Sequence, residues 1–514
     1  MLGNKRVGIA AIALAASLVM TACGSSDGGG SDGGAEGGGT LTLGSIFAPQ
    51  TLAASGAEWA NVSPYIQSVY DSLLRETPDA EVEPWLATEW SYNEDKTVLT
   101  MQLRDDVTFT DGEKFTADVA AQNLLRFKAG TSPNASFLAS VADAKATDEY
   151  TLEITLTAPD PALLNYLAQN AGAQASPATF AAPDAATDPV GSGPYIFNAD
   201  RTVVGSSYVF DRNPEYWAGA EEQHYDQVVI NVLDNSQAQL SAIQGGQVNG
   251  LNLFDNSALD QIEGAGFTAY PHELDWQGLI LFDRAGTMAP ALGDVRVRQA
   301  INHAVDRDAL LKAVVQGYGT ATTQVFDESS AAYVEELDER YPYDPELARE
   351  LLAEAGYAEG FTLSMPNVNL GSTTAADLTA QYLGDVGITV QYDQLSLQEA
   401  IAALLAPKYP ASWIQLQSDP TAWQLANFAL TPTASWNPFR VEDPKVAELV
   451  STLQSGTEEE AEQAGQELNE YIVEQAWFAP YYRVEGTFVA DGDTDVVHQS
   501  NNAYPLLQYI TPNG

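Results

Sequence analysis

The side chains in this chain that could do chemistry are its many acids and its few histidines. His224, His272, His303 and His498 are scattered, and no H-E-x-x-H or other metal-ligand spacing joins them. No G-x-S-x-G nucleophile motif occurs either. The 70 acids could supply a carboxylate pair for glycoside cleavage, so a secreted glycan-acting hydrolase stays open as an alternative. We expect a binding protein rather than an enzyme, with no cofactor or metal of its own.

Aromatic side chains crowd the stretch between residues 413 and 482. A flat aromatic face covers apolar or sugar-like surface while its edge donates a hydrogen bond, which suits a cleft for a small polar solute. The candidate ligand-binding residues of this stretch are Trp413, Trp423, Trp436, Asn437 and Tyr482.

The N-terminus carries the signals of an exported protein. Lys5 and Arg6 precede an apolar run that ends at Met20, and small residues lead to Cys23, the single cysteine. This order resembles the lipobox of bacterial lipoproteins, which implies a signal peptide over 1–22 and a lipid on Cys23. An ordinary signal peptide with a chance cysteine is the alternative. The Gly/Ser-rich segment 23–39 predicts a flexible tether, so we expect an extracytoplasmic protein anchored to the outer face of the cell membrane.

The charge balance excludes some partners. The chain of 514 residues has 70 acids and 22 bases, a net charge of −48. Such a charge repels nucleic-acid phosphates and disfavours adhesion to anionic lipid headgroups. It favours solubility, and adaptation to salty surroundings stays open.

Short strands alternate with helices along the chain. Thr40–Leu43 and Thr97–Leu103 have the alternation of strands, and Asn61–Leu74 has an apolar stripe that predicts a helix. Thr116 predicts a helix cap, and Thr457 predicts a capping box with Glu460. This pattern predicts α/β lobes built on mixed sheets.

Several motifs appear in a fixed order along nearly the whole chain beyond residue 40. They are Tyr70–Arg75, Pro84–Trp90, Leu103–Val119, Val190–Tyr195, Arg212–Trp217 and Asp294–Arg307. Together they resemble family 5 of the bacterial extracellular solute-binding proteins, which bind dipeptides, oligopeptides or nickel. The resemblance implies a monomeric component of an ABC importer that binds a small polar, peptide-like solute and works with membrane permease and ATPase subunits. A sensor that feeds a receptor instead of a permease is a second alternative.

The resemblance also implies a fold. It is α/β, a two-lobed periplasmic-binding-protein-like fold with mixed sheets, an interlobe cleft and an extra insertion domain in lobe one. The implied limits are 40–70, 189–267 and 484–514 for lobe one, 71–188 for the insertion domain and 268–483 for lobe two. Two crossing strands would form a hinge that closes on the solute. Trp276, Glu58 and Trp59, near the entrances to lobe two and lobe one, are further ligand candidates.

Peptide-binding relatives hold the ligand's amino group with an aspartate in a W-x-x-D-x-x-D-P segment. Here the matching segment begins at Trp413, and Leu416 takes the place of the first aspartate. A leucine cannot neutralise a buried ammonium, which argues against an ordinary free-amino peptide. Asp419 matches the second acid and is retained as a ligand candidate.

Two features of the motifs have a structural interpretation. Gly191 and Gly193 are not followed by a lysine, so we expect them to permit a tight turn rather than to hold a phosphate. Trp85, Trp90 and Trp217 are expected in the core.

Overall fold

The computed structural model describes residues 38–79, 81–182, 184–253, 255–368, 374–395, 397–418, 421–499 and 502–513. The predicted signal peptide, Cys23 and nearly all of the predicted tether lie outside these residues, as does Asp419. Among the described residues, no helix has both the length and the apolar character needed to cross a membrane.

A mixed sheet forms the frame of the fold. Among the described residues it has nine strands, eight of them in the order β16-β12-β17-β11-β1-β10-β9-β8, with β13 paired to β17. Strand β1 pairs in parallel with β10 and β11, and the other pairs are antiparallel. The strands are β1 (Thr40–Ser45), β8 (Tyr195–Phe197), β9 (Ser207–Arg212), β10 (Gln227–Val232), β11 (Gly250–Asn252), β12 (Thr268–Leu281), β13 (Gly319–Ala321), β16 (Ala411–Gln417) and β17 (Phe478–Ala490).

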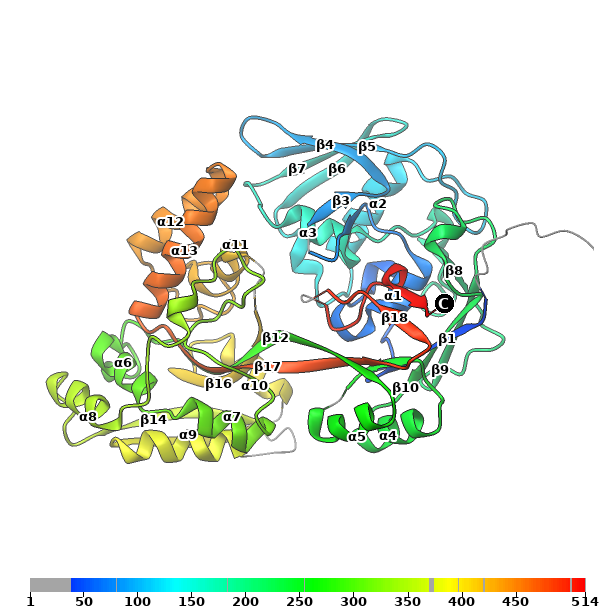
Figure 1. Ribbon diagram of the computed structural model, residues 1–514. Coiled ribbons are helices and arrows are strands. Elements are labelled where there is room, and N and C mark those ends of the chain that lie inside the picture. The colour runs from blue at the N-terminus through cyan, green and yellow to red at the C-terminus, as the bar shows by residue number, and fades with distance from the viewer. Residues whose placement is uncertain are drawn as a thin grey trace, which may run out of the picture. The chain divides into compact units, whose positions relative to one another are not determined.

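The end of this sheet that holds β11, β1, β10, β9 and β8, together with the elements packed around it, is called lobe one (Figure 1). Its separate antiparallel sheet, β4-β5-β7-β6, packs with α2 and α3 around its own apolar core. The further elements of lobe one are α1 (Ser63–Val69), β2 (Leu74–Glu76), β3 (Val82–Pro84), β4 (Ala87–Tyr92), β5 (Val98–Leu103), α2 (Ala117–Lys128), β6 (Val141–Asp148), β7 (Thr151–Leu156), α3 (Leu163–Ala168), α4 (Ser236–Gln244), α5 (Leu259–Gly264), β18 (Thr494–Val496) and β19 (Ile510–Pro512).

Lobe two is mostly helical and has two main apolar cores, on opposite faces of the frame sheet. Its elements besides β13 and β16 are α6 (Val295–His303), α7 (Arg307–Val315), α8 (Pro345–Glu354), β14 (Phe361–Val368), α9 (Thr374–Asp385), β15 (Ile388–Leu395), α10 (Leu397–Leu404), α11 (Ala422–Leu425), α12 (Pro444–Ser455) and α13 (Glu458–Glu474).

Strands β12 and β17 join the two lobes. They pair antiparallel from Thr268 with Ala490 to Ile280 with Phe478, so both are covered by lobe-one elements at one end and by lobe-two elements at the other. Figure 1 shows them side by side between the two groups of elements. A pair of continuous strands is the kind of connection about which two lobes can bend.

Local signals in the sequence fix several helix ends. The Thr116 side chain accepts a hydrogen bond from the Val119 amide at the start of α2. Thr457 and Glu460 form the predicted capping box of α13. These two predictions are confirmed, and strand β5 also falls within the predicted Thr97–Leu103.

The predicted helix over Asn61–Leu74 is wrong at its C-terminal end. Helix α1 stops at Val69, and Tyr70 is extended. The loop around Gly191 docks on this end, because the Gly193 amide donates to the Val69 carbonyl (2.9 Å) and a Cβ at Gly191 would lie 2.0 Å from the same oxygen. Glycine is therefore needed at position 191 for close backbone approach.

The motifs of lobe one converge on a buried carboxylate, Asp71. Trp85 Nε1 and Tyr216 Oη donate to its Oδ1 (2.9 and 2.8 Å), and Ser192 Oγ and Trp217 Nε1 donate to its Oδ2 (both 2.8 Å). Burial raises the pKa of the Asp71 carboxyl, although these four bonds oppose the shift. Trp85 and Trp217, expected in the core, are half-buried and pack against it.

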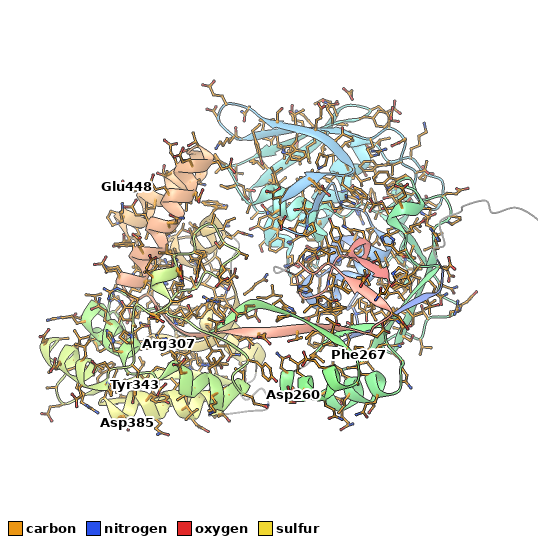
Figure 2. All side chains as sticks on the ribbon, viewed as in Figure 1. Asp260, Phe267, Arg307, Tyr343, Asp385 and Glu448 are labelled. Atoms are coloured by element: carbon orange, nitrogen blue, oxygen red, sulfur yellow. The ribbon has the colours of Figure 1, made fainter. Side chains whose placement is uncertain are left out.

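The counterpart in lobe two is a buried guanidinium, Arg307, which Figure 2 labels. It lies at the first position of α7 and makes five hydrogen bonds, all to uncharged oxygens. The acceptors are the carbonyls of Thr322, Pro480, Asn302 and Tyr341 and the Asn302 side chain. Burial lowers the pKa of Arg307 to about 10.

Candidate functional site

Lobe one and lobe two touch away from the joining strands. Among the described residues, Trp423 Nε1 on α11 donates to Asp160 Oδ1 (2.9 Å). The Gln454 side chain at the end of α12 donates to the Pro159 carbonyl (3.2 Å). Lys96 Nζ, in the turn between β4 and β5, donates to the Gly456 carbonyl (2.8 Å). Trp423 also packs against the core of the four-stranded sheet, so these contacts hold the two lobes together at this edge.

A cavity of ≈ 420 Å³ lies at this contact, with walls from both lobes. Its volume is within the range of small-molecule sites. The wall from lobe one includes Tyr92, Lys96, Pro159, Asp160, Pro161 and Leu164. The wall from lobe two includes Trp423, Leu453, Gln454, Glu458, Ala461 and Glu462. Because neither lobe encloses this space alone, separation of the lobes would open it.

Asp160 is the most constrained polar residue of the cavity. Besides the bond from Trp423, its side chain accepts hydrogen bonds from the Ala162 amide (3.1 Å) and the Ser140 hydroxyl (2.6 Å). Burial raises the pKa of Tyr92 above its usual value, and the nearby charge of Asp160 adds to this shift. The Asp160 carboxylate and the Trp423 N–H are therefore already hydrogen-bonded, and most of the lining surface is aromatic or aliphatic.

A smaller pocket of ≈ 70 Å³ lies within lobe one. Trp59 lines it, and its Nε1 donates to Asn502 Oδ1 (3.2 Å). Glu58, the residue before it, is half-buried. Both predicted residues belong to lobe one and neither lines the larger cavity, so their role as ligand contacts stays a prediction.

Strand register separates three other predicted residues. Trp276 on β12 is opposite Leu416 and Arg483, whereas its neighbour Gln277 is opposite Gln415 and Tyr482. Because side chains alternate between sheet faces, Trp276 and Tyr482 point to opposite faces. Trp276 packs in the cluster with α11 to α13. Tyr482 packs in the other cluster, and its hydroxyl donates to the Gln277 side chain.

Trp413 lies on the same sheet face as Tyr482. Its ring packs against that cluster, and its Nε1 is buried without a hydrogen-bond partner among the described residues. The sequence therefore grouped Trp413 and Tyr482 with Trp276, but the sheet separates them from it.

The last two predicted residues, Trp436 and Asn437, are neighbours in the loop between α11 and α12. Trp436 is half-buried and stacks near Phe282 and Phe428. The amide group of Asn437 is buried and donates to the main-chain carbonyls of Leu430, Thr431 and Val441. These bonds fix the loop after α11, the helix that carries Trp423.

Among the predicted ligand residues that the structure describes, Trp423 alone lines the larger cavity, and Asp419 lies outside the described residues. Lys96, Asp160 and Gln454 were missed, because their partners are far away in the sequence. The segment Pro159-Asp160-Pro161 carried a turn signal, but nothing in it indicated an interlobe contact.

The described residues contain no group of three or more His, Cys, Asp or Glu side chains arranged to hold a metal ion. The cavity itself has two opposed walls, and its lining is mainly apolar with a few charged residues.

Comparison with known proteins gives a consistent picture. The family "Bacterial extracellular solute-binding proteins, family 5 Middle" matches residues 81–437. Heme-binding protein A of Haemophilus influenzae is 30% identical over 325 residues, which cover 57% of this chain and 58% of that protein. The probable peptide ABC transporter periplasmic-binding protein y4tO of Sinorhizobium fredii is 27% identical over 347 residues, which cover 63% of this chain and 64% of that protein.

The solved structure of HbpA2 from Haemophilus parasuis superposes with a TM-score of 0.80 at 21% identity, covering 93% of this chain and 100% of that one. The chain therefore has the two-lobed fold of periplasmic binding proteins, as the motifs predicted.

Proposed function

The chain belongs to family 5 of the bacterial extracellular solute-binding proteins, and on that basis we propose that it is the solute-binding component of an ABC importer. It takes up a peptide-like or other small polar solute outside the cytoplasm and delivers it to permease and ATPase subunits. The relative from Sinorhizobium fredii is named for such a peptide transporter, which supports this role.

The observation that carries the proposal is the cavity with one wall on each lobe. A solute in contact with both walls stabilises the arrangement in which the lobes meet, and it has no such effect when they are apart. Binding therefore shifts the protein toward one conformer by the difference in affinity, and a permease can respond to that conformer. The contact between Trp423 and Asp160 belongs to the closed arrangement.

The joining strands β12 and β17 supply the hinge in this proposal. Lobe one comprises 40–70, 189–267 and 484–514, its insertion domain 71–188, and lobe two 268–483. The Asp71 and Arg307 centres lie one in each lobe and keep each lobe rigid while the strands between them bend.

The predicted anchor completes the proposal. A lipid on Cys23 and a flexible segment up to residue 39 would keep a monomeric protein close to its permease, on the outer face of the membrane. No covalent change of the solute is part of this function, so turnover of a bound glycan would contradict it. A genetic neighbourhood without permease and ATPase genes would favour the sensor alternative.

The first experiment identifies the solute by native mass spectrometry of freshly purified protein. The protein is then stripped of solute, and binding is measured by calorimetry and thermal unfolding. At a hundredfold excess over Kd, the solute should stabilise the protein by about 2.7 kcal/mol.

A matched pair of variants tests whether the cavity is the site. Ala461 is half-buried and lines the cavity, so Ala461→Trp fills the space, whereas Ala447→Trp adds the same ring to an exposed position on α12 outside it. We expect Ala461→Trp to abolish solute binding and Ala447→Trp to preserve it. Equal binding by both variants would refute the cavity as the site.

A further inference from the structure

One buried arginine of lobe two differs from the others. The buried arginines among the described residues are Arg284, Arg298, Arg307 and Arg483. Arg307 is saturated by oxygens, and Arg483 pairs with Asp338 through two bonds of 3.0 Å. Arg284 is 6% exposed, and its Nε donates to the Leu281 carbonyl (3.2 Å). Its Nη1 and Nη2 are buried and have no acceptor among the described residues, so their N–H groups are unsatisfied.

The acids near Arg284 do not supply this acceptor. Asp283, the residue before it, is fully buried, but its two oxygens accept four hydrogen bonds of 2.6 to 2.7 Å from its own loop, residues 287–289. Asp443 lies close enough for its charge to act on Arg284. Its oxygens accept instead from the Tyr471 hydroxyl and from two amides at the start of α12. Both carboxylates are therefore committed to other donors.

A second guanidinium adds positive charge to this region. Arg298 on α6 donates through its Nε and Nη1 to the carbonyls of Gln475 and Leu292 (2.9 and 2.6 Å). Burial lowers the pKa of Arg284 to about 9, and the charge of Arg298 adds to this shift, whereas that of Asp443 opposes it. Arg284 remains protonated at neutral pH. Two buried cations therefore lie near each other in a chain that is strongly acidic overall.

Aromatic rings contact Arg284 but cannot replace an acceptor. Its Cζ lies 4.4 Å from the ring centroid of Trp477 and 5.6 Å from that of Phe478. The ring faces attract the positive charge, but they offer no oxygen or nitrogen lone pair to the N–H groups. A buried charged donor without an acceptor carries the full cost of its lost hydration. An anion in contact with the two nitrogens would remove that cost.

We propose that Nη1 and Nη2 of Arg284 bind a small monovalent anion such as chloride, with Arg298 as a second source of positive charge. The two nitrogens are shielded from solvent, which excludes a bulky acceptor, and the charge of Asp443 disfavours a divalent ion. Neither arginine lines the ≈ 420 Å³ cavity, so the ion stabilises lobe two and is not the transported solute.

Bromide tests the site directly, because it has the charge of chloride and scatters X-rays anomalously. Crystals of the parent protein grown in sodium bromide should show an anomalous difference peak in hydrogen-bonding contact with both Nη atoms of Arg284. Density there without an anomalous signal would be a water molecule and would overturn the proposal. The absence of any density beside the two nitrogens would overturn it equally.

Thermal unfolding tests the site in solution. Sodium chloride is compared with sodium gluconate at equal ionic strength, and chloride should raise the Tm of the parent protein by about 1–2 °C, with saturation. Arg284→Met removes the donors and keeps an unbranched apolar stem, so it should lose this difference between the salts. Arg340→Met is the matched control, because Arg340 lies over the Tyr341 ring (5.5 Å) but is exposed. It should keep the difference.

Two results in solution would contradict the anion site. They are an equal Tm of the parent protein in the two salts, and a chloride effect of undiminished size in Arg284→Met. If Arg284→Met does not fold, the bromide crystals and the salt dependence of the parent protein still decide the matter. None of these outcomes bears on solute binding, which the comparison of Ala461→Trp with Ala447→Trp tests separately.

Discussion

Asp71 in lobe one and Arg307 in lobe two face the same physical problem and meet it differently. Each is a charged group buried without an opposite charge in hydrogen-bonding contact. Asp71 is surrounded by four side-chain donors, from Trp85, Ser192, Tyr216 and Trp217. Arg307 is surrounded by oxygens, four of its five acceptors being main-chain carbonyls.

The difference concerns what each centre requires of the sequence. The donors of Asp71 are particular side chains, so the centre depends on the identity of residues in four separate motifs. A carbonyl is present at every residue, so the centre of Arg307 depends on the path of the backbone instead. A burial cost of several kcal/mol per ion is offset in both cases by saturating the charge with hydrogen bonds.

The largest effect is expected from Arg307→Met. The substitution leaves the acceptors from Thr322, Pro480, Asn302 and Tyr341 buried without a donor, and each such group costs about 1–3 kcal/mol. Relief of the charge burial offsets part of this, so we expect a loss of about 4 kcal/mol in the free energy of unfolding. Urea unfolding followed by circular dichroism measures it.

Arg349→Met is the matched control. Arg349 also donates to a main-chain carbonyl, that of Asp385, but it is exposed. Its loss should change stability by less than about 0.5 kcal/mol. If the two variants were equally stable, saturation of the buried guanidinium would not matter, and the comparison of the centres would fail.

Asp71→Asn tests the other centre with a change of nearly equal shape. The asparagine oxygen still accepts two bonds, but its NH2 group faces two donors. The N–H groups of Trp85 and Trp217 can only donate, so they cannot adapt by accepting a hydrogen bond from the asparagine NH2 group. We expect a loss of about 3 kcal/mol, measured as for Arg307. Asp105→Asn, at an exposed site of the same lobe, should be nearly neutral. Equal stability of the two asparagine variants would show that the four donors do not depend on the charge.

Local signals made part of the fold predictable. Caps such as Thr116 and Thr457 act within four residues, so the sequence carried them. The end of α1 was not predictable in this way, since the Gly191 loop that stops it comes more than a hundred residues later. Trp85 and Trp217 were expected in the core, but composition does not reveal that their N–H groups meet on Asp71.

The candidate site was less predictable than the fold. An aromatic-rich stretch indicated Trp423, but its partner Asp160 is 263 residues away. Alternation along β12 could have separated Trp276 from Tyr482, but only once the pairing of β12 with β17 was known. Contacts between lobes depend on how separately folded parts meet, and no local pattern encodes that.

A stacked pair of histidines extends the comparison of Asp71 with Arg307, because hydrogen bonds do not saturate these two buried titratable groups. His272 on β12 and His498 have ring centroids 5.0 Å apart, and each has a buried ring nitrogen without a partner among the described residues. Burial lowers the pKa of His272 to about 3, with a contribution from His498, and that of His498 to about 4. Both are therefore neutral in the folded protein near pH 7.

The pH dependence follows from these shifts. Below the ordinary histidine pKa of ~6.5, the unfolded chain takes up protons that the folded chain does not, so stability falls as pH falls. Each histidine should cost about 2 kcal/mol between pH 6.5 and pH 5. His498→Phe keeps an aromatic ring and should remove about half of the histidine contribution. The difference in unfolding free energy between variant and parent at each pH isolates the histidine contribution, because the acids contribute equally to both proteins. Parallel pH profiles would contradict the assignment.

Trp423→Phe should have the smallest effect, on binding and not on folding. It removes the bond to Asp160 across the lobes but keeps a ring in the cavity wall, and Asp160 retains Ser140 and Ala162 as donors. Because this contact exists only when the lobes meet, its loss should weaken solute binding about fivefold, or ~1 kcal/mol. Calorimetry with the co-purified solute measures the loss of affinity. Trp90→Phe is the control, because it alters a half-buried ring of β4 that does not line the cavity. A loss of unfolding free energy as large as that of Asp71→Asn would instead place Trp423 in the framework of one lobe, since a contact formed only on closure cannot stabilise either lobe by itself.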